Sequence, residues 1–367
     1  MSENYGDYQT DIYGRGALTG VLPNVTTDPR LLEKQAKKAL GARSFNYVAG
    51  GAGEKATMDS NRLAFRQWKL MNDQNLAVNL FGQHYPTPLL MAPVGVQSIF
   101  HDDKESGLAE ACGNVGIPYI LSTASSSSIE EVAQANGDGK RCSLDTWSLA
   151  WRPADLDNAY VPFIRGVGNT LGFTDPVFRS KFEKESGSTV EEDIVGASKA
   201  WISQVFYGQP HAWEQIAFLR KNWDGPLVLK GIQHVDDAKL ALEAGCDGIV
   251  VSNHGGRQVD GAIGSLEVLP EIVDAVGGKM TVLFDSGVRT GADIIKALCL
   301  GADAVLVGRP VIYGLAIDGK NGAEAVMKGL LADLWQTMSL SGIRTVAECT
   351  RDKIRKVVYP GDGKAML

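Results

Sequence analysis

Short runs of consecutive apolar residues, many of them β-branched, recur along this chain and alternate with longer segments whose apolar residues are spaced three and four apart. The runs predict strands buried on both faces, and the wider spacing predicts amphipathic helices. On this basis we expect strands at residues 88–93, 119–123, 142–145, 227–230, 248–253, 280–285 and 304–307. We expect helices at residues 28–40, 107–116, 129–135, 212–221, 266–276, 292–300, 323–338 and 343–349.

Two stretches of the C-terminal half, residues 237–253 and 293–309, resemble each other. Each contains a helix, a glycine, an aspartate between small residues, and a strand that ends in a polar turn. Such a repeat predicts stacked βα units. Parallel strands with polar residues at their C-terminal ends are typical of the α/β class and of a TIM (β/α)8-type barrel. A closed barrel of this kind has eight strands, whereas the pattern predicts seven.

Candidate chemistry follows directly after the strand at residues 248–253. His254 can bind a proton near neutral pH, and Arg257 offers a planar fork for a carboxylate. Gly255 and Gly256, which lie between them, allow a backbone turn in which a Cβ atom would collide. A proton acceptor and an anion-binding group thus leave one strand end together, although this tetrapeptide alone is also typical of an arginine-capped turn.

The turns after the last two strands have the composition of a phosphate site. Gly287 and Arg289 follow one strand, and Gly308 and Arg309 follow the next. Glycines leave backbone amides open to a ligand, and guanidinium groups bind phosphate oxygens. In TIM barrels the loops after the seventh and eighth strands commonly bind phosphate.

Four sequence features together carry a resemblance to a known family. They are Lys230 at a strand end, Ser-Asn-His-Gly-Gly-Arg-Gln at residues 252–258, Asp-Ser-Gly-Val-Arg at residues 285–289, and Gly-Arg-Pro at residues 308–310. With them, the chain resembles the FMN-dependent α-hydroxy acid oxidase family over nearly its whole length, and most closely its lactate 2-monooxygenase branch. The resemblance implies FMN as cofactor, and a small L-2-hydroxy acid and O2 as substrates.

The resemblance also implies roles for individual residues. His254 takes the substrate's proton and Asp145 orients it, while Tyr47, Arg152 and Arg257 bind the substrate carboxylate. The residues implied in FMN binding are Pro93, Val94, Gly95, Ser122, Ser143, Lys230, Ser252, Asp285, Gly287, Arg289, Gly308 and Arg309. No metal-ligand spacing occurs among the five cysteines, which we expect to be free and mostly buried.

One part of the family pattern is missing. Residues 137–141 lead directly into residues 142–147, where family members have a strand with a Gln-Leu-Tyr signature, a helix and the start of another strand. In the family this Gln binds flavin and this Tyr binds the substrate hydroxyl. We therefore predict that the third βα unit, about 25 to 30 residues, is absent. Its loss would leave two strand edges unpaired or force a different closure of the barrel.

Gly95 bears on the products, because related oxidases often have alanine there. A missing methyl group next to the flavin would let pyruvate stay beside peroxide, which favours lactate 2-monooxygenase chemistry giving acetate, CO2 and water. Close backbone packing is an equally good explanation of this glycine. Trp147 and Trp151 suggest a narrow pocket and hence lactate or another small hydroxy acid. The alternatives are an oxidase that releases H2O2, a cytochrome-linked dehydrogenase, and a shortened homologue with impaired catalysis.

Composition narrows the class of protein. With 367 residues and 44% hydrophobic content, the chain is expected to form one domain, in which residues 1–40 are an N-terminal arm and helix and residues 153–200 a lid. No apolar run approaches the roughly 20 residues of a membrane helix, and a net charge of -7 argues against nucleic acid as a partner. We expect a homo-oligomer, a tetramer or larger by resemblance, in the cytoplasm; the C-terminal tripeptide only faintly resembles a peroxisomal signal.

Overall fold

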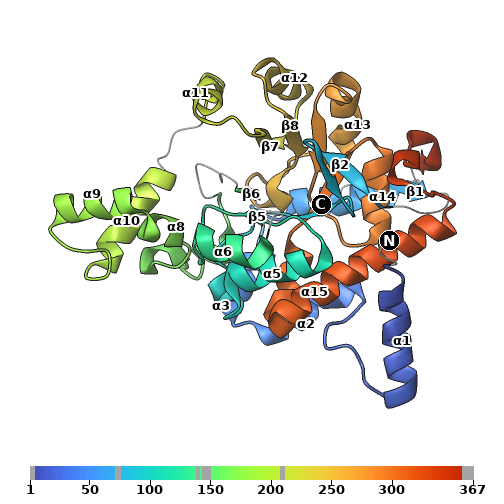
Figure 1. Ribbon diagram of the computed structural model, residues 1–367, viewed down its shortest axis with the longest axis horizontal. Helices are drawn as coiled ribbons and strands as arrows, with labels where there is room; N and C mark the ends of the chain where they lie inside the picture. The colour runs from blue at the N-terminus through green and yellow to red at the C-terminus, as the bar shows by residue number, and fades with distance from the viewer. Residues whose placement is uncertain (1–4, 71–75, 138–140, 143–149, 207–210, 358–367) are drawn as a thin grey trace.

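The computed structural model describes residues 5–70, 76–137, 141–142, 150–206 and 211–357. Ser143, Asp145 and Trp147 lie outside the described residues, so the roles given to them above remain predictions. A parallel sheet occupies the centre of the molecule, helices pack around it, and a small helical lobe extends to one side (Figure 1).

The parallel strands fall at the predicted apolar runs, although residues 143–145 of the run predicted at 142–145 lie outside the described residues. Five of them pair in parallel in the order β4-β10-β9-β8-β7. A parallel bridge between Met91 and Tyr119 continues the sheet to β5, which pairs in parallel with β6. The bounds are β4 (Leu89–Met91), β5 (Ile120–Leu121), β6 (Arg141–Cys142), β7 (Val228–Ile232), β8 (Gly248–Val251), β9 (Thr281–Phe284) and β10 (Ala304–Val307).

The order of the strands is that of a TIM-type barrel, because the last strand, β10, lies beside the first, β4. The opposite side of the sheet differs from a closed barrel. Strand β6 pairs directly with β5, and among the described residues no pairing joins β6 to β7. Among the described residues, β7 therefore has a single strand partner, β8.

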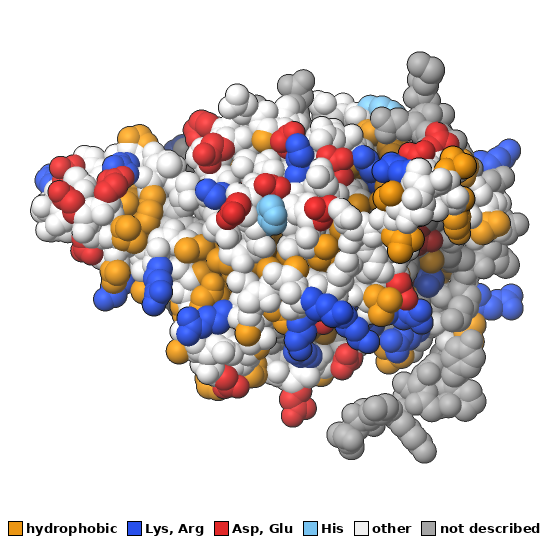
Figure 2. Space-filling view, turned by 90° about the horizontal axis from the view of Figure 1, so that it is seen from below, with side chains coloured by type: hydrophobic (Ala, Val, Ile, Leu, Met, Phe, Trp, Pro, Cys, Tyr) orange, Lys and Arg blue, Asp and Glu red, His pale blue; other side chains and the backbone are white. Residues whose placement is uncertain are grey.

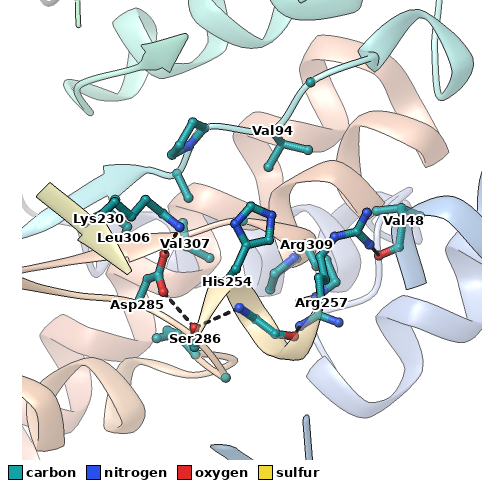
Figure 3. A pocket seen from close by; sticks show the side chains of 18 of the residues that line it. Val48, Val94, Lys230, His254, Arg257, Asp285, Ser286, Leu306, Val307 and Arg309 are labelled. Atoms are coloured by element: carbon teal, nitrogen blue, oxygen red, sulfur yellow. Dashed lines mark hydrogen bonds and ion pairs between the residues drawn. The ribbon is translucent and has the colours of Figure 1, made fainter. Parts of the chain in front are cut away.

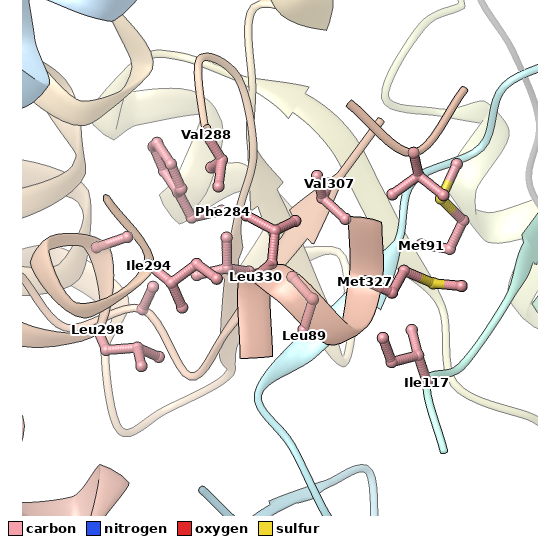
Figure 4. Close-up of a cluster of buried hydrophobic side chains, with 14 of the residues drawn as sticks. Leu89, Met91, Ile117, Phe284, Val288, Ile294, Leu298, Val307, Met327 and Leu330 are labelled. Atoms are coloured by element: carbon pink, nitrogen blue, oxygen red, sulfur yellow. The ribbon is translucent and has the colours of Figure 1, made fainter. Parts of the chain in front are cut away.

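The strands are buried because helices cover the outer face of the sheet. Every residue of β8 and of β10 is buried. Leu89 and Phe284 from the strands pack with Ile294 of α14 and with Met327 and Leu330 of α15 (Figure 4). Each such side chain contributes roughly 1.5–3 kcal/mol on burial, so this layer holds the strand ends in a fixed arrangement.

The helices begin and end largely where capping residues occur. Asp28 accepts from the amide of Arg30 before α2, and Ser128 forms a capping box with Glu131 at α6. The helices are α1 (Asp7–Thr19), α2 (Pro29–Ala39), α3 (Ala42–Ala49), α4 (Ala56–Gln67), α5 (Lys104–Val115), α6 (Ile129–Asn136), α7 (Pro153–Leu156), α8 (Thr170–Thr174), α9 (Pro176–Ser186), α10 (Ile194–Val205), α11 (Gln215–Asn222), α12 (Val235–Glu243), α13 (Ser265–Val276), α14 (Gly291–Cys299) and α15 (Arg309–Leu340).

Several short elements complete the chain. Strand β1 pairs antiparallel with β11, and β2 with β3. The prediction of a helix at residues 343–349 is wrong, because that stretch contains only a single 3-10 turn, η5. The bounds are β1 (Trp68–Leu70), β2 (Val78–Leu80), β3 (Gln83–Tyr85), β11 (Ile354–Lys356), η1 (Gln97–Ile99), η3 (Pro162–Arg165), η4 (His254–Gly256), η5 (Val346–Glu348) and η6 (Arg351–Lys353).

The segment predicted as a lid, residues 153–200, is helical. The lobe consists of the turn η3, which contacts α10, and helices α8, α9 and α10, which are labelled in Figure 1. Phe178, Phe182 and Ala197 give these helices a hydrophobic core of their own. On the face shown in Figure 2, Lys and Arg side chains occur together with Asp and Glu, so neither sign of charge covers this face alone. Among the described residues, no helix has both the length and the apolar character needed to cross a bilayer.

Candidate active site

A cavity of roughly 1000 Å³, including its open mouth, lies at the C-terminal ends of the central strands. Its walls come from the segments that follow β4, β7, β8, β9 and β10, together with α3 and the lobe. This is the end of the sheet at which barrel enzymes place their chemistry. The predicted site residues that line it are Tyr47, Pro93, Val94, Gly95, Arg152, Lys230, His254, Arg257, Asp285, Gly287, Arg289, Gly308 and Arg309.

The turn after β8 presents His254 to this cavity. Its backbone is left-handed at three successive residues, with φ values of 55° at His254, 65° at Gly255 and 72° at Gly256. Ser252 Oγ accepts from the His254 amide at 3.0 Å, and the Asn253 side chain accepts from the Gly256 amide at 3.1 Å. Two glycines and two side-chain hydrogen bonds thus hold a turn that ordinary residues disfavour.

The electrostatic surroundings keep His254 neutral. Burial, and after it the positive charges of Lys230, Arg257, Arg152 and Arg309, lower the pKa of His254 well below its ordinary value of 6.5. Both effects disfavour the protonated ring. At neutral pH the imidazole therefore carries a free nitrogen lone pair, as a proton acceptor requires.

Two arginines and a tyrosine form one wall of the cavity. The guanidinium of Arg257 lies over the ring of Tyr47, 5.2 Å from its centroid, and Arg257 Nη1 donates to the Tyr47 carbonyl at 2.7 Å. Arg152 Nε donates to the Arg257 carbonyl at 3.1 Å, and Arg152 Nη2 donates to Gln258 Oε1 at 3.0 Å. These contacts hold two guanidiniums next to each other on one wall of the cavity, and a guanidinium has the planar fork of donors that suits a carboxylate.

A hydrogen-bonded chain lies on the other side of His254. Lys230 Nζ is 3.3 Å from Asp285 Oδ2 and donates to Ser252 Oγ at 3.2 Å. Ser286 Oγ donates to Asp285 Oδ1 at 2.7 Å and accepts from the Gly255 amide at 3.0 Å. Figure 3 shows Lys230, Asp285 and Ser286 on one side of the His254 ring, and Arg257 and Arg309 on the other. Residues from three different strand ends are therefore mutually fixed.

Two guanidiniums at one end of the cavity have the character of an anion site. Among the described residues, neither Arg289 nor Arg309 forms an ion pair; the nearby carboxylate of Asp293 pairs with Arg62 instead. Burial lowers the pKa of Arg309 to about 10, with the Arg289 charge contributing. At Gly308 the nearest atoms to an added Cβ lie 3.7 Å away, so the backbone there is open. Two buried guanidiniums that form no ion pair among the described residues fit the phosphate of FMN.

The segment after β4 packs tightly against the segment after β5. The amide of Val96 donates to the Ala124 carbonyl at 2.7 Å. A Cβ atom added to Gly95 would lie 2.5 Å from the Ala124 carbonyl oxygen. The glycine is therefore required by close packing in this structure, which supports the second of its two interpretations.

Some predicted residues lie near the cavity without lining it. Ser252 is buried behind Lys230 and His254 and supports both. Ser122 is also buried, and its Oγ accepts from the Ala124 amide at 3.2 Å. Trp151 is 76% exposed and does not narrow the cavity, so the argument from tryptophans for a small substrate is wrong at this position.

Three aromatic residues of the cavity wall were not predicted. They are Phe100, Phe163 and Phe206. Phe163 and Phe206 come from the lobe, far in sequence from the strand ends, so no motif indicated them. Ser286 was noted only as part of a glycine-rich turn, and the structure makes it the link between Asp285 and Gly255.

Fold and site together define a barrel protein that can hold a phosphate, a carboxylate and a proton acceptor in one cavity. The model of the FMN-dependent dehydrogenase family matches residues 36–143 and 139–356. The FMN-dependent alpha-hydroxy acid dehydrogenase qulF of Penicillium citrinum is 60% identical over 400 aligned residues, which cover 99% of each chain. An L-lactate oxidase of Lysinibacillus sphaericus is 37% identical, covering 86% of this chain and 89% of its own.

Solved structures agree with the sequence comparisons. A crystal structure of mandelate oxidase aligns with a TM-score of 0.73 at 31% identity, over 89% of this chain and 98% of its own. The chain therefore belongs to the family of FMN-dependent α-hydroxy acid dehydrogenases and oxidases. It is an oxidoreductase by family, and FMN is its cofactor.

Proposed function

We propose that this protein oxidises a 2-hydroxy acid to the 2-oxo acid with FMN. The observation that carries the proposal is the convergence of a neutral His254, the Arg257–Arg152 pair and Lys230 on one cavity. Each group alone has a structural explanation. Their common cavity at the strand ends supports a single site in which an anion is bound beside a base.

The substrate carboxylate is assigned to Arg257 and Arg152, with the Tyr47 hydroxyl as a third donor. The Arg257 guanidinium is fixed by the carbonyls of Tyr47 and Gly50, at 2.7 and 3.1 Å. Arg152 is 5% exposed and is in turn fixed to the Arg257 backbone. Binding a carboxylate to arginines that are already oriented costs little conformational entropy, and it places the substrate's Cα next to His254.

His254 then takes a proton from the substrate. The oxidation removes two electrons and two protons from the hydroxy acid, and His254 accepts one of these protons on Nε2 or Nδ1. Before the reaction, the nearby positive groups keep the ring unprotonated and therefore able to accept it. FMN, when bound, would accept the two electrons together with the second proton. We assign Asp145 to stabilise the protonated imidazole, by resemblance only, because it lies outside the described residues.

The same cavity offers groups for holding FMN. Arg289, Arg309 and the backbone at Gly287 and Gly308 suit its phosphate. Lys230 suits the part of the ring system on which negative charge gathers, and Asp285 and Ser252 keep its ammonium in place.

For the fate of the product we favour release of the 2-oxo acid and H2O2 over oxidative decarboxylation. The monooxygenase hypothesis relied on extra room at Gly95. The contact between an added Cβ and the Ala124 carbonyl explains this glycine by packing, and so withdraws the support for extra room.

A second candidate is a shortened homologue in which FMN binding is weak or substrate turnover is slow. Three observations support a missing βα unit near residue 141. The two family matches overlap at residues 139–143. The alignment with the Penicillium protein has 400 positions, more than the 367 residues of this chain, and β6 pairs directly with β5. The relative therefore has residues with no counterpart here. Their loss removes side chains from the wall next to the flavin.

The deciding experiment is the visible absorption spectrum of the purified protein under anaerobic conditions, before and after a 2-hydroxy acid is added. A flavin spectrum that bleaches supports catalysis, and the products formed in air then distinguish 2-oxo acid with H2O2 from acetate with CO2. A colourless protein, or a yellow one that no 2-hydroxy acid bleaches, supports the second candidate. His254→Asn is the matched control, which should keep the flavin and lose the bleaching.

We also propose that the protein forms a homo-oligomer through α1. This helix projects from the body (Figure 1), none of its residues is buried, and Tyr13 and Leu18 are exposed. Substituting both by serine is expected to lower the molar mass measured by light scattering while FMN content is unchanged. An unchanged mass would contradict this role for α1.

A further inference from the structure

We infer that the substrate's side chain carries an aromatic ring and that Phe163 and Phe206 of the lobe select for it. This inference deepens the proposed function and rests on it. It starts from the part of the cavity that neither the anion site nor the base occupies. That part is bounded by four rings, those of Tyr47, Phe100, Phe163 and Phe206.

The rings adjoin the carboxylate-binding arginines directly. The Arg257 guanidinium lies over the Tyr47 ring, and the Tyr47 ring is 6.4 Å from that of Phe100. Phe163 and Arg152 both line this cavity and a second one beside it. A 2-hydroxy acid held by its carboxylate on the arginines therefore has its side chain next to aromatic surface.

Tyr47 and Phe206 are partly buried and so keep surface that a further ring can contact, whereas Phe100 and Phe163 are almost fully buried and back the cluster. Phe163 and Phe206 are 5.6 Å apart and inclined by 56°, and Tyr160 meets Tyr47 edge to face at 6.5 Å. Aromatic rings prefer such tilted and edge-to-face arrangements, in which another ring adds to the cluster. A methyl group, as in lactate, would leave most of this apolar surface without a contact.

The second cavity gives the side chain room. It has roughly 500 Å³, including its mouth, and shares Tyr47, Arg152 and Phe163 with the first. Apart from Arg152 and Asp155, its described lining is apolar or aromatic, with Leu156 and Val161 among the residues. A side chain that extends from the first cavity past Phe163 therefore stays in apolar surroundings.

The lobe supplies the selective residues without supplying any proposed catalytic group. Phe163 is 3% exposed and packs on Val96 and Ala124, whereas Phe206 is only partly buried at the end of α10. Phe206 is therefore the better residue to change, because its truncation removes cavity wall with less loss of core packing.

The experiment compares L-lactate with L-3-phenyllactate, which share the carboxylate and the reacting carbon. We expect kcat/KM for phenyllactate to exceed that for lactate by at least about tenfold, since a single methylene in an apolar pocket already changes specificity by about that factor. Equal values, or a preference for lactate, would overturn the inference while leaving the proposed oxidation intact.

Variants then test the residues. Phe206→Ala is expected to lower kcat/KM for phenyllactate about tenfold and that for lactate less than threefold. Phe218→Ala is the matched control, because Phe218 is 68% exposed on α11, does not line the cavity and should change neither value. An equal loss for both acids in Phe206→Ala would assign Phe206 a purely structural role and overturn the inference.

Equilibrium binding separates failure of this inference from failure of the proposed function. Phenylpyruvate and pyruvate are titrated into the FMN-loaded protein, and binding is measured from the shift in the flavin spectrum. Tighter binding of phenylpyruvate that Phe206→Ala abolishes supports the inference even when no hydroxy acid is turned over. Equal binding of the two oxo acids overturns it whether or not turnover occurs.

Discussion

At the scale of single residues, the site gathers positive charge around one base. Four cations, those of Lys230, Arg152, Arg257 and Arg309, lower the pKa of His254, and Lys230 is paired with Asp285. Positive charges brought this close repel one another, and anionic ligands would offset that repulsion. The same charges that bind the ligands also keep the base unprotonated.

The lowered pKa of His254 predicts a one-sided pH profile. The neutral ring is the active form, and its pKa lies well below 6.5, so the His254 contribution to kcat/KM should be constant above pH 6.5. The contribution is lost as the pH falls through the lowered pKa. Steady-state kinetics from pH 4.5 to 8 checks this. An acid limb already present between pH 7 and 8 would contradict it.

Arg309 is predicted to contribute to FMN affinity. Arg309→Met removes a charge that no ion pair satisfies among the described residues, and charge-assisted hydrogen bonds contribute about 1.5–3 kcal/mol. The Kd for FMN, measured by flavin fluorescence, should therefore rise at least about tenfold. Arg344→Met is the control, since that side chain is 75% exposed and pairs with Glu348. An unchanged Kd in Arg309→Met would remove Arg309 from the anion site.

At the scale of elements, the active cavity is built from strand ends that touch through backbone. The segment after β4 lies on the segment after β5, with Val96 donating to Ala124, and the turn after β8 is tied to the segment after β9 through Ser286. Short contacts of this kind fix positions better than long side chains do. They also leave little tolerance for added atoms.

Gly95→Ala tests this packing directly. The added methyl group would approach the Ala124 carbonyl oxygen to 2.5 Å, so one of the two segments must move. We expect a loss of about 1–3 kcal/mol in the free energy of unfolding, measured by denaturant titration, together with a lower FMN content. The neighbouring Val94→Ala should leave the segment in place. A stable Gly95→Ala protein whose products alone change would restore the monooxygenase hypothesis.

At the scale of the whole molecule, the unusual feature is the sheet that pairs β6 with β5 and leaves β7 with a single neighbour among the described residues. Strand β7 carries Lys230, so among the described residues this side of the cavity wall has no second strand beside it. Its first three residues are only partly buried, whereas β8 and β10 are buried throughout. An edge strand is more easily opened than a strand between two neighbours.

Hydrogen exchange should reveal this edge. Amides of β7 are expected to exchange faster than those of β9, which has neighbours on both sides. Exchange measured by mass spectrometry on peptides covering residues 228–232 and 281–284 makes the comparison. Added FMN should slow exchange in β7, because a ligand that contacts Lys230 favours the closed state. Equal protection of the two strands without FMN would show that residues elsewhere cover the edge.

The sequence by itself determined the strands, the barrel class and the residues at the strand ends. Consecutive apolar, β-branched residues are typical of strands buried on both faces of a sheet, and the parallel order then brings His254, Lys230, Arg289 and Arg309 to one end. These residues could be predicted because each motif directly follows its own strand, so that the sequence pattern that indicates it is short in range. The sequence also predicted a missing unit, since the strand count and the family pattern agreed.

Only the tertiary structure decided which strands pair and which side chains line the cavity. Pairing of β6 with β5 depends on which edges meet in space. The packing role of Gly95 depends on the Ala124 carbonyl, 29 positions away. Phe163 and Phe206 of the lobe pack with Val96 and Ala124 rather than in the lobe's own core. Apolar residues there predict burial without predicting that two of them face the cavity. Contacts between segments distant in sequence leave no local pattern, which is why these features required the structure.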